Sequence, residues 1–205
     1  MKIYTKKFVY LISPNKIPRK YFYKDLELVF RSNKISFFQL RLKKENKKNK
    51  IKIGKKIKKL CSKYKVKFII NDDPNLALHL DADGCHLGQK DMKINKAKAI
   101  LKNKIIGITC HNSIRLARSA IKKKASYIAF GAFFSTKTKK AKYKASVKIV
   151  KSFKKISKIP IVGIGGINNR NYKNLLLNNV NFLAISGYIW NNKKYKPQDA
   201  IKLLK

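Results

Sequence analysis

Residues 105–131 read IIGITCHNSIRLARSAIKKKASYIAFG, and this stretch decides the fold. It begins with the apolar run Ile105–Thr109 and ends with the apolar run Tyr127–Gly131. Each run predicts a buried β-strand, because its apolar residues are continuous and do not alternate with polar ones. Between the runs, Leu116 and Ala120 share one helical face, while arginines and lysines occupy other positions. A strand, a helix and a second strand in this order predict a β-α-β unit with parallel strands.

The same alternation extends over the whole chain of 205 residues. Eight strands alternating with helices is the arrangement of a (β/α)8 TIM barrel, an α/β fold, near the lower length limit of that fold. An open, doubly wound parallel sheet of about six such units is the structural alternative. No linker rich in proline or serine divides the chain, so we expect a single TIM-barrel domain over residues 1–205. The predicted strands are Phe8–Ser13, Ile35–Leu40, Val66–Ile70, Gly84–Leu87, Ile105–Thr109, Tyr127–Gly131, Ile161–Ile164 and Phe182–Ser186.

The chain carries 51 Lys and Arg against 9 Asp and Glu, a formal net charge of +42. This charge favours polyanions, so a basic nucleic-acid-binding protein without catalysis is one functional alternative. However, only 6 of the 51 cations are arginines, and the lysines are spread over the chain without interleaved aromatic residues. Abundant Lys, Asn and Ile are also what an AT-rich coding sequence produces. We therefore expect no specific nucleic-acid partner.

The cysteines and the apolar segments indicate the compartment. Cys61, Cys85 and Cys110 lie far apart and form no CxxC pair, which argues against a disulfide framework and a zinc ribbon. The longest apolar run, Tyr127–Phe134, has eight residues and is too short to span a bilayer. The first residues lack both the apolar length and the cleavage site of a signal peptide. We expect a cytoplasmic location and no membrane partner.

The few acidic residues are concentrated, with five of the nine between residues 72 and 91. Asp72 and Asp91 follow adjacent predicted strands, so their carboxylates can converge at the mouth of a barrel. Two carboxylates with open water positions suit Mg²⁺, which retains waters and accepts phosphate oxygens of a substrate. Asp81 and Asp83 instead belong to the predicted turn between a helix and the fourth strand.

Polar or glycine residues follow seven consecutive predicted strands, the place where a TIM barrel builds its active site. Gln39, Arg41 and Lys43 alternate along the end of the second strand and therefore point the same way. An arginine fork beside a lysine point charge suits a diphosphate group.

The loops after the sixth, seventh and eighth predicted strands suit a second phosphate. Thr136, Thr138 and Lys139 offer hydroxyl groups and a cation, although a solvated loop explains them equally well. Gly165-Gly166 lets backbone N–H groups approach an anion, with a helix N-terminus behind it. A tight turn that needs glycine is the alternative, but the neighbouring pair Ile185-Ser186 favours the phosphate interpretation.

Cys110 and His111 are the one pair that suggests thiol or imidazole chemistry. No third group is placed to orient them, so we expect no protein nucleophile. A proton-transfer role for His111 remains open.

Seven motifs together carry a family resemblance. In chain order they are QLRLK, IINDD, DADGCHLGQKD, GITCH, GAFFSTKTK, GIGGI and LAIS, at residues 39–43, 69–73, 81–91, 107–111, 131–139, 163–167 and 183–186. From about residue 35 to residue 190 the chain resembles thiamine phosphate synthases, and HLGQKD and TKTK are the most specific motifs. GITCH and GAFFSTKTK look most like the variant found in alphaproteobacteria.

The resemblance implies a transferase of thiamine biosynthesis. It would join 4-amino-2-methyl-5-(diphosphooxymethyl)pyrimidine to a thiazole phosphate, releasing pyrophosphate by a dissociative, Mg²⁺-assisted mechanism. The implied catalytic residues are Arg41, Lys43 and Lys139, which would stabilise the leaving diphosphate, and the implied Mg²⁺ ligands are Asp72 and Asp91. The resemblance assigns the pyrimidine diphosphate to Gln39, Arg41, Lys43, Asn71, Thr109 and Lys139, and the thiazole phosphate to Thr136, Thr138, Gly166, Ile185 and Ser186.

Four residues depart from the family pattern. Thr109 stands where serine is common, which preserves the hydroxyl group. Asp73 takes a place often held by arginine and adds a negative charge beside the metal. Ala132 and Ser135 replace prolines, so the sixth loop loses rigidity.

The related thiazole tautomerases share the fold and use a histidine placed like His111, so a tautomerase is the alternative within this fold. They resemble the chain less at the metal aspartates and at TKTK.

Overall fold

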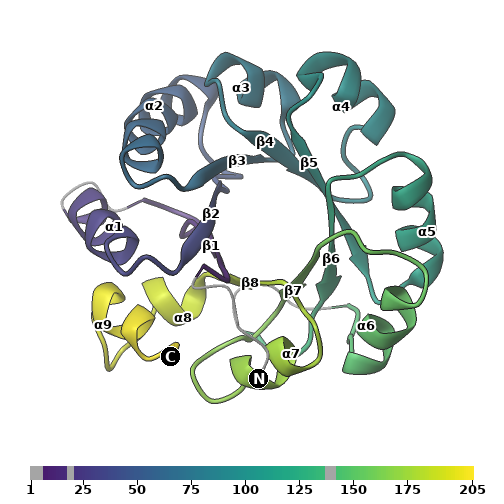
Figure 1. The fold of residues 1–205 in the computed structure, drawn as a ribbon. Helices are drawn as coiled ribbons and strands as arrows, with labels where there is room; N and C mark the ends of the chain where they lie inside the picture. Colours follow the sequence, from purple (N-terminus) through teal and green to yellow (C-terminus); the bar gives the residue numbers. More distant parts are fainter. Residues whose placement is uncertain (1–6, 18–20, 137–141) are drawn as a thin grey trace.

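The computed structural model describes residues 7–17, 21–136 and 142–205, and within these ranges a ring of strands is surrounded by helices (Figure 1). All strands are parallel and close into one barrel in the order β1 to β8. The strands are β1 Val9–Ile12, β2 Ile35–Leu40, β3 Lys67–Asn71, β4 Gly84–Leu87, β5 Ile105–His111, β6 Tyr127–Gly131, β7 Ile161–Ile164 and β8 Phe182–Ile185.

Helices connect successive strands on the outside of the ring, and α9 packs back against α1. None of the helices in the described ranges is long and apolar enough to cross a membrane. The helices are α1 Phe22–Phe30, α2 Lys47–Lys63, α3 Pro74–His79, α4 Ile94–Leu101, α5 Ile114–Lys122, α6 Val147–Lys154, α7 Tyr172–Leu177, α8 Gly187–Trp190 and α9 Pro197–Lys202.

The barrel prediction is confirmed, and the open-sheet alternative is wrong. The first strand pairs with the last, with Val9 opposite Leu183 and Leu11 opposite Ile185. An open sheet would leave two strands unpaired along one side, whereas each of these eight strands pairs on both sides. Closure brings the carboxyl ends of all eight strands to one end of the barrel.

Alternation along each strand divides the core into two parts. Val9 packs in the large cluster between the sheet and the helices, whereas its neighbour Tyr10 belongs to a smaller cluster inside the barrel. In the interior, the Tyr10 ring lies 5.3 Å from that of Phe37 and 5.8 Å from that of Tyr127, between ring centroids. Phe37 in turn meets Phe182 edge-on at 5.0 Å. Aromatic rings therefore fill much of the barrel interior.

Four turns that lead from a helix into the next strand share one conformation. Lys65, Asp81, Lys124 and Asn179 occupy the left-handed region, with φ values of 53°, 45°, 54° and 66°. This is the Schellman ending of a helix, a position that favours glycine. In each turn the next residue is buried and donates its N–H to the carbonyl five residues earlier: Val66 to Cys61, Ala82 to Ala77, Ala125 to Ala120 and Val180 to Leu175.

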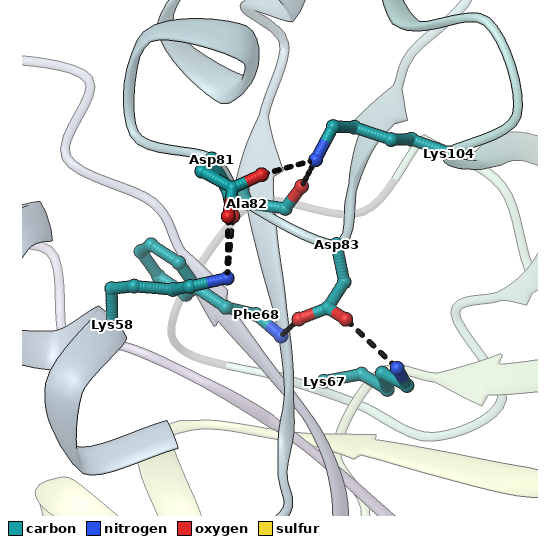
Figure 2. A network of polar contacts seen from close by, with 7 residues as sticks. All are labelled: Lys58, Lys67, Phe68, Asp81, Ala82, Asp83 and Lys104. Carbon is teal, nitrogen blue, oxygen red and sulfur yellow. Dashed lines mark hydrogen bonds and ion pairs between the residues drawn. The ribbon is translucent and has the colours of Figure 1, made fainter. Parts of the chain in front are cut away.

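The turn roles predicted for Asp81 and Asp83 are confirmed (Figure 2). Asp83 forms an ion pair of 2.9 Å with Lys67 and accepts the backbone N–H of Phe68 at 2.9 Å. Asp81 forms an ion pair of 2.7 Å with Lys104. These contacts join the α3–β4 turn to the starts of the neighbouring strands, at the end of the barrel opposite the strands' carboxyl ends.

Candidate active site

The described residues that the sequence assigned to the site lie at the carboxyl ends of the strands. Because the strands are parallel and closed in a ring, these positions face one opening. Gln39 and Thr109 lie within β2 and β5, Asn71 and Ile185 end β3 and β8, and Arg41, Lys43, Asp72, Asp91, Thr136, Gly166 and Ser186 lie in the loops beyond. Thr138 and Lys139 lie outside the described residues.

A cation and two carboxyl groups meet between the ends of β3 and β4. The Lys43 Nζ lies 2.8 Å from Oδ2 of Asp72. The carboxyl group of Asp72 lies within hydrogen-bonding reach of that of Asp91, and Oδ2 of Asp91 also accepts the N–H of Gly88 at 2.7 Å. The two aspartates predicted to act together are therefore in contact.

The two carboxyl groups differ in acidity. Burial raises the pKa of Asp72, but the hydrogen bonds with Lys43 and Asp91 and nearby positive charge outweigh it and hold that pKa below its usual value. Burial, together with the hydrogen bond to Asp72 and its charge, raises the pKa of Asp91. Two carboxyls in contact repel each other when both are ionised, and a cation between them relieves that repulsion.

This donor set fits Mg²⁺. The ion prefers hard oxygen ligands and is commonly held by one or two carboxylates, with waters and phosphate oxygens completing its shell. Within the described ranges, no group of three or more His, Cys, Asp or Glu side chains could hold a metal ion. Asp72 and Asp91 are thus a partial site that leaves room for substrate oxygens.

An open pocket of about 380 Å³ lies beside this cluster. Lys43, Asn71 and Asp72 line it, so it brings together three of the predicted site residues. Lys50 adds a second cation from α2, and Met92 adds an apolar wall. Because Asp72 and Asp73 balance the two lysines, the pocket suits an anionic group that arrives together with a metal ion.

Arg41 is held by the end of β1. Its Nη1 donates to Oδ1 of Asn15 at 2.9 Å, and its backbone N–H donates to Oγ of Ser13 at 2.9 Å. The carbonyl of Ser13 also accepts the hydroxyl of Ser186 at 3.2 Å. The loops after β1, β2 and β8 are thereby joined, and a guanidinium group held in this way loses less freedom when it binds an anion.

A chain of hydrogen bonds runs through the upper barrel between two predicted site residues, Gln39 and Thr109. Gln39 Nε2 donates to the Tyr10 hydroxyl at 3.0 Å, and that hydroxyl lies 2.7 Å from the hydroxyl of Tyr127. Tyr127 continues to Nδ1 of His86 at 2.9 Å, and Nε2 of His86 reaches Oγ1 of Thr109 at 2.9 Å. Desolvation lowers the pKa of His86 to about 4, although the charge of Asp72 acts in the opposite direction.

Sequence reasoning assigned no role to Tyr10, Tyr127 or His86. The motif containing His86 was visible, and its alternation with Cys85, which packs in the outer core, would have turned His86 toward the barrel interior. The two tyrosines gave no signal, because each lies in an apolar run typical of a buried strand.

The Gly165-Gly166 turn is packed against the loop after β6. Gly165 and Gly166 have φ values of 104° and 64°, and a Cβ on Gly166 would lie 2.2 Å from the carbonyl oxygen of Ser135. Glycine is therefore required here by both backbone conformation and close approach. The helix predicted behind this turn is α7, but its N-terminus does not lie directly against the two glycines. A turn held by Asn171, which donates to the carbonyl of Gly166 at 3.0 Å, intervenes before α7 begins at Tyr172.

Two further residues near the site, Asp73 and His111, have contacts of their own. The carboxylate of Asp73 caps α3 by accepting the N–H of Leu76 at 2.9 Å, which explains an acidic residue next to Asp72. The ring of His111 lies 4.4 Å from the ring of Tyr143, between centroids, at the end of β5.

Known proteins resemble the chain over nearly its whole length. A family model described as "Thiamine monophosphate synthase" matches residues 9–189. A thiamine-phosphate synthase of Pelagibacter ubique (strain HTCC1062) is 70% identical over 98% of this chain and 97% of its own. Another, from Rhodospirillum centenum, is 34% identical over 90% of this chain and 89% of its own. Among solved structures, thiamine phosphate pyrophosphorylase from Pyrococcus furiosus has a TM-score of 0.85 at 28% identity, covering 97% of this chain and 94% of that one.

The fold, the charged cluster at the barrel mouth and these relatives agree with one another. The chain belongs to the thiamine monophosphate synthase family, and its activity is that of a transferase that forms thiamine phosphate.

Proposed function

We propose that the chain joins 4-amino-2-methyl-5-(diphosphooxymethyl)pyrimidine to a thiazole phosphate, with Mg²⁺ held by Asp72 and Asp91. The contact between Lys43, Asp72 and Asp91 beside an open pocket carries this proposal. A cation and two carboxyls at one point suit a ligand that brings both a metal ion and phosphate oxygens.

Mg²⁺, when bound, would neutralise negative charge on the diphosphate as that group departs. Arg41 and Lys43 supply fixed positive charge on the same side of the barrel, and Lys139 is proposed to act with them. Removing one such preorganised group is expected to raise the barrier by about 3 kcal/mol.

The proposed reaction is dissociative. The bond between the methylene carbon and the diphosphate oxygen breaks first, and both bonding electrons leave with pyrophosphate. The thiazole nitrogen then donates its lone pair to the methylene carbon of the pyrimidine cation, so the reaction needs no protein nucleophile.

The state of the three cysteines supports a reaction without a protein nucleophile. Cys61, Cys85 and Cys110 are buried, and burial raises the pKa of each thiol, in Cys110 to about 12. A thiol with so high a pKa is not a thiolate at neutral pH and is a poor nucleophile.

The thiazole phosphate is proposed to bind at the opposite side of the opening, at Thr136, Thr138, Gly166, Ile185 and Ser186. Its support is the left-handed Gly165-Gly166 turn, which packs closely against the loop after β6 that leads to Thr136. We further propose that the reaction takes place in the cytoplasm, since the three cysteines are unpaired.

The test is formation of thiamine phosphate by the purified protein from both phosphorylated substrates, with Mg²⁺ and with a chelator. We expect product only with Mg²⁺, and a loss of roughly 100-fold in Asp91→Asn with the circular dichroism spectrum unchanged. Asp199→Asn, which removes an exposed carboxylate on α9, is the matched control and keeps full activity.

Two outcomes would contradict the proposal. Unchanged product formation in the chelator would remove Mg²⁺ from it. No product from the folded, Mg²⁺-supplied protein would show that these two compounds are not its substrates.

A further inference from the structure

The hydrogen-bond chain inside the barrel ends at two residues proposed to contact the pyrimidine, Gln39 and Thr109. Between them, Tyr10 is 1% and Tyr127 is 3% exposed, so these hydroxyls have little access to water. Buried polar groups that lack water must satisfy one another, and the direction of each bond then limits the direction of the next. The following inference rests on the proposed pyrimidine substrate.

The amide of Gln39 sets the donor-to-acceptor direction of the hydrogen bonds. Its Nε2 can only donate, so the oxygen of Tyr10 accepts, at 3.0 Å. Within the described ranges, the remaining hydrogen-bond partner of that hydroxyl is Tyr127, so the Tyr10 proton points toward Tyr127. The Tyr127 oxygen then accepts, and its own proton goes to Nδ1 of His86.

His86 transmits this direction to Thr109. A ring nitrogen that accepts a hydrogen bond carries no proton, so the neutral imidazole holds its proton on Nε2 and donates it to Oγ1 of Thr109. The pKa of about 4 agrees with a neutral ring at neutral pH. The hydroxyl proton of Thr109 is not used in this bond and is left to donate to another acceptor.

The other end of the hydrogen-bond chain, at Gln39, offers the ligand an acceptor where Thr109 offers a donor. One N–H of Gln39 Nε2 is engaged with Tyr10, and the other arm of the amide carries the acceptor Oε1. Among the described residues no hydrogen bond reaches this Oε1, and it is not one of the enclosed polar atoms without a partner. It is therefore an acceptor that is open to a ligand.

We propose that Tyr10, Tyr127 and His86 are positioning residues that fix Gln39 as a hydrogen-bond acceptor and Thr109 as a donor toward the pyrimidine. In the 4-amino pyrimidine, the exocyclic amine donates to Gln39, and a ring nitrogen with a lone pair accepts from Thr109. A 4-oxo pyrimidine reverses both groups, since it offers a carbonyl oxygen and a ring N–H. The network thus favours the 4-amino compound over the 4-oxo compound through the pyrimidine ring alone, independently of contacts with the diphosphate.

The first experiment reads the tautomer of His86 without substrate. The chain has three histidines, and the ¹⁵N shifts of their ring nitrogens, measured at pH 7, show which nitrogen carries the proton. The His86 signals are assigned by their absence in His86→Gln. We expect the proton on Nε2. A proton on Nδ1 would overturn the inference, whatever the protein's activity.

The second experiment breaks the hydrogen-bond chain at Tyr127, which lies in its middle and not at either end that faces the ligand. In Tyr127→Phe, His86 loses the proton donor that fixes its tautomer, and Thr109 becomes free to turn. We expect KM for the pyrimidine diphosphate to rise about tenfold, with kcat within about twofold, and the preference over the 4-oxo analogue to fall about tenfold. Tyr172→Phe, which removes a buried hydroxyl that donates to the carbonyl of Lys205, is the control and keeps the wild-type values.

The failure of this inference and of the proposed function can be told apart. If wild-type protein forms product and Tyr127→Phe keeps the wild-type KM and preference, the positioning role is refuted while the function stands. If wild-type protein forms no product, the proposed function fails, and with it the ligand on which this inference rests.

Discussion

Acidification should destabilise the fold through one buried imidazole. In the folded protein both nitrogens of His86 are hydrogen-bonded, and Nδ1 has no room for a proton unless the bond from Tyr127 is lost. Desolvation accordingly lowers the pKa of His86 to about 4, whereas an unfolded histidine titrates near about 6.5. The unfolded chain therefore takes up this proton first as the pH falls.

The sign and size of the effect follow from linkage. Between pH 6.5 and pH 4 the unfolded state binds the proton and the folded state does not, so stability falls with falling pH in this window. The gap between the two pKa values corresponds to a loss of roughly 3 kcal/mol from pH 7 to pH 4. Below pH 4 both states are protonated at His86, and this contribution levels off.

The assay is urea unfolding of wild-type protein and His86→Gln at pH 7, 5.5 and 4. Groups with lower pKa values, such as Glu27 at about 2, act alike in both proteins. The stability lost between pH 7 and pH 4 should be smaller by roughly 3 kcal/mol in His86→Gln. The control His79→Gln removes an exposed imidazole and should retain the wild-type loss.

An equal loss in wild-type protein and His86→Gln would refute this reasoning. It would mean that His86 is protonated as readily in the folded state as in the unfolded state. The hydrogen bonds to both of its nitrogens would then not hold in solution.

Three other substitutions test separate parts of the structure. Gly166→Ala places a Cβ 2.2 Å from a backbone oxygen of the loop after β6, at a φ of 64°, so it should cost about 2 kcal/mol of stability in urea unfolding and raise KM for the thiazole phosphate. Asp83→Ala removes an ion pair and a bond to the backbone, and should cost about 1–2 kcal/mol in the same assay with no change in KM. Lys43→Met removes an ammonium group that helps to hold the pKa of Asp72 low, so that pKa rises and the acid limb of the kcat/KM profile moves to higher pH, whereas exposed Lys44→Met leaves the profile in place.

The strands were predictable because closure of a barrel buries both faces of each one. All eight apolar runs became strands, with boundaries that agree within two residues. Ile35–Leu40 agrees at both ends, whereas β5 continues past Thr109 to His111. The apolar pattern could not show that extension, since the additional residues are not part of an apolar run.

The charged part of the site was equally accessible to sequence reasoning. Asp72 and Asp91 follow neighbouring strands, and a parallel barrel places such positions side by side, which led to the contact that the structure shows. The partner of Asp72 was less evident, because Lys43 is one of many lysines and only the fold selects it.

The interior network could not be predicted, because no local pattern encodes it. Tyr10 and Tyr127 bond to each other across 117 residues of sequence. Each is a β-forming aromatic residue within an apolar run, which core packing alone would explain. Similarly, glycines at Gly165-Gly166 showed that a turn was needed there but did not show that α7 begins only at Tyr172.

The left-handed turns that lead into β3, β4, β6 and β8 limit how far the composition of this chain can change. Lys65 and Lys124 adopt a backbone conformation that costs an L-residue about 1–2 kcal/mol and glycine nothing, offset in part by the greater freedom of glycine in the unfolded chain. A gene that drifts toward lysine codons can therefore lose glycines at these turns one by one. Because the turns lie at the end of the barrel remote from the candidate site, we expect each such exchange to lower stability without changing a site residue. The tolerable number of such exchanges is set by the small free energy of folding, and not by selection on the reaction.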